Sequence, residues 1–94
     1  MYKILIVEDD PSIQEILHDF IQEAGYDITL ASDGVEALTK FSESHFDLIL
    51  LDIMLPKIDG YSVSEVIRKK SDIPIIMLTA LDSEEAQIRR PNGR

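Results

Sequence analysis

The chain of 94 residues contains no cysteine and no tryptophan, and basic residues are few. Without cysteine there is no disulfide, no thiolate nucleophile and no cysteine-ligated metal, which excludes the disulfide-dependent secreted scaffolds. Nine lysines and arginines stand against eighteen aspartates and glutamates, which leaves a formal charge of −9. A surface this acidic repels phosphate backbones, so we expect no direct nucleic-acid binding by this chain.

Long apolar runs are also missing. The runs at residues 4–7 and 48–51 are strand-sized, too short for the core of a signal peptide and far too short to span a bilayer. We therefore expect no membrane partner and a cytoplasmic location. The length permits one domain with a modest core of its own.

Four short apolar runs divide the chain, at residues 4–7, 28–31, 48–51 and 75–78. They are rich in Ile, Leu and Val and do not alternate with polar residues, which is typical of strands covered on both faces. Helical patterns follow the first three runs, and a weaker pattern begins at Asp82. This order predicts an α/β fold, a doubly wound parallel sheet with helices on both faces.

The first helical pattern is the longest. Its apolar residues form a stripe that we expect to face the sheet: Ile13, Ile16, Leu17, Phe20, Ile21 and Ala24. Ser12 and Glu15 stand at capping-box spacing at its start, and Gly25 ends it. Asp59 and Gly60 predict a turn into the third helix, with Gly60 supplying an unusual backbone dihedral.

Acidic residues follow two of the predicted strands. Glu8, Asp9 and Asp10 come after the first run, and Asp52 comes after the third. Because parallel strands end at the same edge of a sheet, we expect these carboxylates to converge, where a divalent cation would neutralise them. Carboxylate, carbonyl and water oxygens are the ligands that Mg²⁺ prefers. One acid alone is explained as a solvated cap, but acids on two strand ends favour a metal.

Four motifs, in order and at these separations, carry a resemblance: ILIVEDDP at 4–11, DLILLDIMLP at 47–56, Asp59-Gly60, and IIMLTA at 75–80. The chain resembles the receiver domain of two-component response regulators of the winged-helix DNA-binding type. That resemblance implies a flavodoxin-like sheet with strand order 2-1-3-4-5. It also implies a phosphoacceptor rather than an enzyme, with at most weak self-phosphorylation and dephosphorylation.

The resemblance also implies roles for individual residues. Asp52 would accept a phosphoryl group from a sensor histidine kinase. Asp9, Asp52 and the backbone carbonyl of Met54 would bind Mg²⁺, with Glu8 helping through water. Thr79 would be the switch hydroxyl that contacts the phosphoryl group. A carboxylate attacks phosphorus only where the phosphoryl charge is shielded, which is the chemistry a magnesium ion supplies.

The sequence departs from the family at its C-terminal end. Receivers carry a fifth strand with a phosphoryl-contacting lysine and a fifth helix, whereas residues 90–94 do not resemble that continuation. We expect residues 1–89 to form a truncated receiver, with impaired phosphorylation. The apolar run at 75–78 would then be a sheet edge, which predicts a homodimer by edge pairing or exchange of elements. An inactive, self-associating fragment with only a structural role is the alternative.

Overall fold

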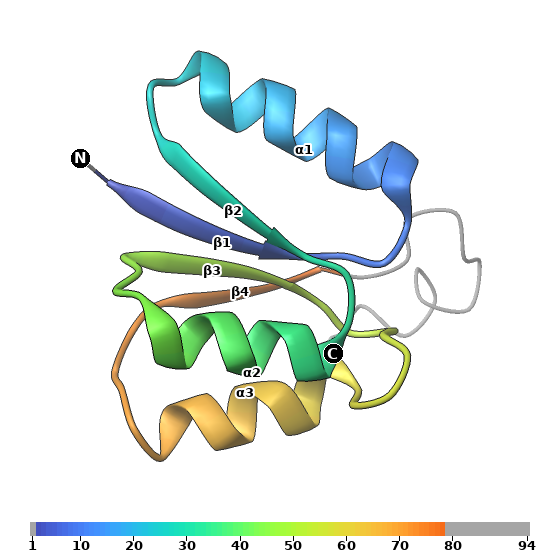
Figure 1. The fold of residues 1–94 in the computed structure, drawn as a ribbon, viewed down its shortest axis with the longest axis vertical. Helices are drawn as coiled ribbons and strands as arrows, with labels where there is room; N and C mark the ends of the chain where they lie inside the picture. The colour runs from blue at the N-terminus through green and yellow to red at the C-terminus, as the bar shows by residue number, and fades with distance from the viewer. Residues whose placement is uncertain (1, 79–94) are drawn as a thin grey trace, which may run out of the picture.

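The computed structural model describes residues 2–78, in which strands and helices alternate (Figure 1). The elements are β1 (Lys3–Val7), α1 (Pro11–Glu23), β2 (Asp27–Ala31), α2 (Gly34–Glu43), β3 (Leu48–Asp52), α3 (Gly60–Arg68) and β4 (Ile75–Leu78). The predicted strand positions are confirmed to within about one residue at either end. The helical pattern from Asp82 and the tail at 90–94 lie outside the described residues.

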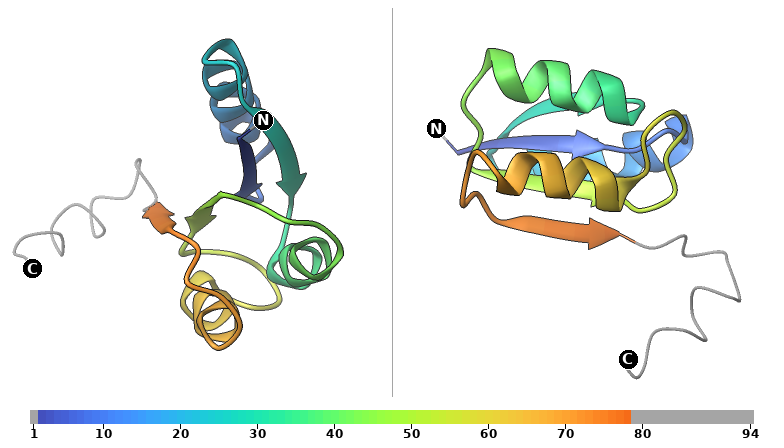
Figure 2. Two further views of the ribbon diagram at one scale, coloured as in Figure 1. Left: turned by 90° about the vertical axis from the view of Figure 1, so that its left-hand side faces the viewer. Right: turned by 90° about the horizontal axis from the view of Figure 1, so that it is seen from below.

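The four strands are parallel and lie in the order β2-β1-β3-β4. α1 covers one face of this sheet, and α2 and α3 cover the other (Figure 2). The predicted doubly wound α/β fold is therefore confirmed over the described residues. All the strands end at the same edge, which is where ligands bind in open sheets of this kind. Between residues 2 and 78, no helix is long and apolar enough to cross a membrane.

Successive residues of the central strands point to opposite faces, and both faces are apolar. Leu5, Val7, Ile49 and Leu51 are buried in the larger core cluster, together with residues of α2 and α3. Ile4, Ile6 and Leu50 form the second core cluster, against which Leu17 and Ile21 of α1 pack. This double coverage is why the strands read as continuous apolar runs rather than as an alternating pattern.

The start of α1 and its buried face both differ from the prediction. The helix is capped by Asp10, whose carboxylate accepts the Ser12 N–H at 2.8 Å, and Pro11 is the first helical residue. Proline suits that position because its missing N–H would have no partner there. The predicted stripe is also wider than the buried face, since Ile16 and Phe20 are 66% and 76% exposed.

Candidate metal centre

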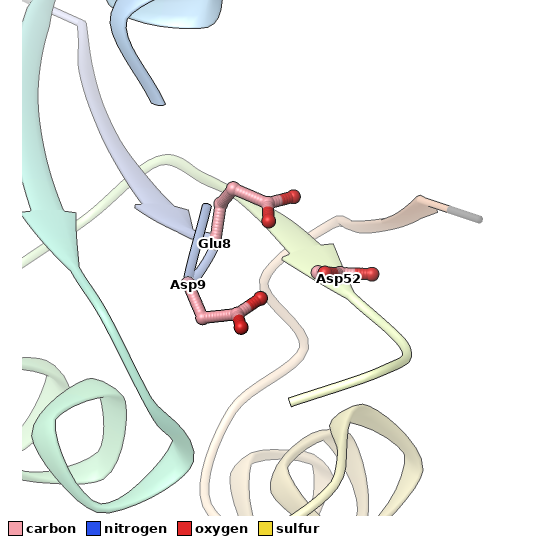
Figure 3. A group of neighbouring side chains, drawn as sticks. All are labelled: Glu8, Asp9 and Asp52. Carbon is pink, nitrogen blue, oxygen red and sulfur yellow. The ribbon is translucent and has the colours of Figure 1, made fainter. Parts of the chain in front are cut away.

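The sheet register brings the acidic residues together. β1 and β3 are adjacent, and Val7 lies opposite Leu51, so the chain after each strand leaves the sheet at the same place. Glu8 and Asp9 extend from the turn after β1 toward Asp52 at the end of β3 (Figure 3). Each of the three residues offers a carboxylate oxygen, and these atoms lie within 4.8 Å of one another. The predicted convergence of Glu8, Asp9 and Asp52 is therefore observed.

Two of these carboxylates are buried, and backbone amides orient them. Glu8 is 3% exposed and Asp52 is 6% exposed, whereas Asp9 is exposed to solvent. The N–H of Asp10 donates to Glu8 Oε2 at 3.0 Å, and the N–H of Met54 donates to Asp52 Oδ1 at 3.1 Å. Neutral donors of this kind fix the direction of a carboxylate but leave most of its charge uncompensated.

The pKa values of Glu8 and Asp52 are both raised, because their negative charges are buried without a compensating positive charge. Burial raises the pKa of the Glu8 carboxyl from 4.5 to about 7, and the charges of Asp52 and Asp9 act in the same direction, against the Asp10 N–H. Burial also raises the pKa of Asp52, and the charge of Asp9 adds to that effect, whereas the N–H of Met54 and the Glu8 side chain oppose it. Without a cation, the Glu8 carboxyl therefore loses its proton only near pH 7, beside an Asp52 carboxyl whose pKa is also raised.

The donor set fits magnesium. Three carboxylates meet at one edge, two of them buried, and burial raises the pKa of both Glu8 and Asp52, so ionising these two side by side costs free energy. Mg²⁺ binds carboxylate oxygens and retains several waters, and an exposed residue such as Asp9 leaves room for those waters. A divalent cation would remove the repulsion that burial imposes on this cluster.

A glycine holds the loop after β3 close to the site. The Gly60 N–H donates to the Ile53 carbonyl at 2.9 Å, and a Cβ at Gly60 would lie 2.2 Å from the Asp52 carbonyl oxygen. The reason predicted for this glycine was wrong, because within residues 2–78 the glycine with positive φ is Gly25. Close approach, not an unusual dihedral, requires glycine at position 60.

The remaining predicted residues lie at the same edge or beyond the described chain. Met54 follows Asp52 by two residues, and its N–H orients the Asp52 carboxylate. Thr79 lies outside the described residues, directly after Leu78, which is the partner of Asp52 in the ladder between β3 and β4. Sequence reasoning missed Gly34, at which a Cβ would lie 2.3 Å from the Ile58 carbonyl oxygen. Its signal is the Asp33-Gly34 pair shortly after the second apolar run.

Comparison with known sequences identifies a family. A family model described as the response regulator receiver domain matches residues 4–90. The probable transcriptional regulator ycf27 of Cyanophora paradoxa is 54% identical over 84% of this chain and 33% of its own length. The regulatory protein VanRB of Enterococcus faecalis is 45% identical over 93% of this chain and 40% of its own length. The chain thus spans about a third of these relatives.

Solved structures of response regulators superpose on this chain. The response regulator protein TrrA of Thermotoga maritima, crystallised in complex with Mg²⁺ and BeF, superposes with a TM-score of 0.82 at 47% identity. The match covers 87% of this chain and 72% of that one. A complex of histidine kinase ThkA with TrrA matches with a TM-score of 0.80 at 44% identity, over 94% and 79% of the two chains.

Proposed function

Since the chain belongs to the response regulator receiver family, we propose that Asp52 accepts a phosphoryl group from a sensor histidine kinase. The observation that carries this proposal is the convergence of Glu8, Asp9 and Asp52 at one edge of the sheet. The crystallised complex of a related regulator with its histidine kinase supports the choice of partner. The proposal includes a cytoplasmic location and, in a longer protein like the curated relatives, control of transcription.

In this proposal Asp9, Asp52 and the Met54 carbonyl hold Mg²⁺, and Glu8 contributes through water. When bound, the cation shields the phosphoryl charge and aligns the reacting groups. Asp52 is the nucleophile because a strand end and the Met54 N–H fix its carboxylate. A bond forms between an Asp52 oxygen and phosphorus while the donor's bond to phosphorus breaks, and the electron pair leaves with the donor.

Thr79 is proposed as the switch hydroxyl. It follows Leu78, which lies opposite Asp52 in the ladder and whose carbonyl accepts the Ile53 N–H at 3.0 Å. A threonine here offers one rotatable donor for a phosphoryl oxygen on Asp52. Among the 94 residues, no lysine follows Lys70 that could contact the phosphoryl group. For this reason we propose that the chain of 94 residues is phosphorylated slowly.

Intact mass tests the proposal. The protein is incubated with Mg²⁺ and a small-molecule phosphodonor, and the mass is followed with time. We expect a slow gain of one phosphoryl group that is abolished by EDTA and by Asp52→Asn, because each removes the nucleophile or the charge shielding. Asp72→Asn, an exposed carboxylate away from the cluster, is the matched control and should behave as wild type. Modification that persists in Asp52→Asn would contradict the assignment, and rapid stoichiometric transfer would contradict its slowness.

A self-associating, structural role is the second candidate. β4 is an outer strand of the described sheet, and its Ile76 is 50% exposed. An apolar strand with one unpaired edge recruits another strand, so we propose a homodimer of this chain by pairing of β4 or exchange of elements. Sedimentation analysis should show a dimer at micromolar concentration that Ile76→Lys weakens. A folded monomer for the wild-type protein would contradict this prediction.

A further inference from the structure

The loop between β3 and α3 contains a strained turn. The Ile58 N–H donates to the Pro56 carbonyl at 2.8 Å, and the residue between them, Lys57, has a φ of 71°. A hydrogen bond across three residues with positive φ at the centre is a classic γ-turn, which is rare and strained. Lys57 has a Cβ, so it lacks the freedom that glycine has in this region. Such a conformation persists only where its surroundings impose it.

The start of α2 imposes it. Gly34 lets the Ile58 backbone approach so closely that a Cβ at Gly34 would clash with it. Beside this contact, Lys57 Nζ lies 3.4 Å from Asp33 Oδ2. Asp33 is itself fixed, because its Oδ1 caps α2 by accepting the Glu36 N–H at 2.7 Å. The tip of the loop is therefore held against α2 by one backbone contact and one ion pair.

The base of the loop is fixed independently. The Gly60 N–H closes onto the Ile53 carbonyl, and the Met54 N–H is bound to Asp52. Leu55 and Ile58 pack against the larger core cluster beneath the loop. Met54 thus lies between a closed base and a tip that is held on α2. Because the peptide units between these two points are short and rigid, the direction of the Met54 carbonyl depends on both of them.

We infer that Lys57 is a positioning residue for the cation site: its turn and its pair with Asp33 set where the Met54 carbonyl lies relative to Asp9 and Asp52. The inference rests on the proposed function, in which that carbonyl is a ligand. The change in Mg²⁺ affinity expected on removing the Lys57 charge is opposite in sign to the change that charge repulsion alone would cause. A positive charge near a cation site weakens binding, so removing it would tighten Mg²⁺ binding unless Lys57 also holds the loop.

Titration of the full chain with Mg²⁺ by calorimetry tests the inference. We expect Lys57→Met to raise the dissociation constant about tenfold, the lower end of the range for residues that orient metal ligands. Lys57→Arg keeps the positive charge and can still reach Asp33, so it should bind Mg²⁺ as tightly as the wild-type protein. Lys69→Met removes an exposed lysine after α3 and should leave binding unchanged or slightly tighter.

Asp33→Asn completes a double-mutant cycle. Asparagine retains an oxygen for the helix cap but loses the charge that Lys57 meets. We expect Asp33→Asn alone to weaken Mg²⁺ binding about as much as Lys57→Met, and the double variant to weaken it no further. If the double variant instead lost Mg²⁺ affinity by the sum of the two single losses, Lys57 and Asp33 would act independently, and the inference that they act as a pair would be overturned.

The outcomes separate the inference from the proposed function. Wild-type protein that binds Mg²⁺, lost in Asp52→Asn, together with unchanged or tighter binding in Lys57→Met, overturns the inference alone. Wild-type protein that binds no Mg²⁺ overturns both. If Lys57→Met fails to fold, Lys57→Gly replaces it, because glycine adopts the positive φ without strain. That variant should resist urea at least as well as wild type while binding Mg²⁺ more weakly, and wild-type affinity in it would overturn the inference.

Discussion

Asp52→Asn is expected to stabilise the protein when no metal is present. In EDTA at about pH 8, which is above the pKa of about 7 of Glu8, the buried Glu8 carboxylate is ionised and lies beside Asp9 and Asp52 with no cation to compensate its charge. Asparagine removes one charge and keeps an oxygen for the Met54 N–H. Relief of about 1–2 kcal/mol corresponds to a rise in melting temperature of roughly 5–15 °C for a domain of this size. Thermal denaturation followed by circular dichroism measures it.

Magnesium should reverse this order. A ligand at about 100 times its dissociation constant adds roughly 2.7 kcal/mol to the stability of the state that binds it. Wild-type protein gains this stabilisation, whereas Asp52→Asn has lost a ligand and gains less. Asp72→Asn, an exposed acid, should match wild type in both conditions. Lower or unchanged stability of Asp52→Asn in EDTA would contradict the claim that the carboxylates strain one another.

The stability of the metal-free protein should fall as the pH rises from about 5 to 8. The pKa of Glu8 is about 7 in the folded protein and 4.5 ordinarily. Between these two pH values the folded state holds a proton that the unfolded state has released. The resulting stabilisation is fully present below this range and is lost as the pH rises through it. A shift of this size corresponds to about 3 kcal/mol at most. Urea denaturation across the pH range in EDTA measures the loss.

Glu8→Gln isolates the source of this dependence. Glutamine resembles the protonated acid, so the free energy of unfolding of this variant should change much less with pH. Glu15→Gln, on the exposed side of α1, should keep the wild-type dependence on pH. Backbone hydrogen bonds lower the pKa of Asp33 and of Glu36. Their stabilisation is present above their ordinary pKa values and is lost in stronger acid, which is opposite in sign to the contribution of Glu8. A steep slope that survives in Glu8→Gln would refute the assignment to this residue.

The strands and the acidic cluster were predictable because both depend on short-range patterns. Apolar runs without alternation identify strands buried on both faces, and the acids at the C-terminal ends of β1 and β3 must lie at one edge of the sheet when those strands are parallel neighbours. The neighbour relation itself came from the family resemblance, since nothing local in the sequence states which strands pair. The role of Thr79 remains a prediction.

The errors lie where contacts between distant segments decide the outcome. Ile16 and Phe20 continue the apolar pattern of α1 but are exposed in the described structure, because the helix presents only Leu17, Ile21 and their neighbours to the sheet. Asp10, not Ser12, is the N-cap of α1, because Pro11 occupies the first helical position and the helix therefore begins earlier than predicted. Periodicity reports which residues are apolar, not how wide a face the partner element covers.

The sequence by itself determined how strands and helices follow one another along the chain and which acids are available for a cation. The tertiary structure decided that Gly34 and Gly60 allow close backbone approaches, that Lys57 meets Asp33, and that Glu8 is buried, which raises the pKa of its carboxyl. The physical reason is range. Hydrogen bonding and apolar periodicity act within a few residues, whereas clashes, ion pairs and burial depend on segments that only the completed fold brings into contact.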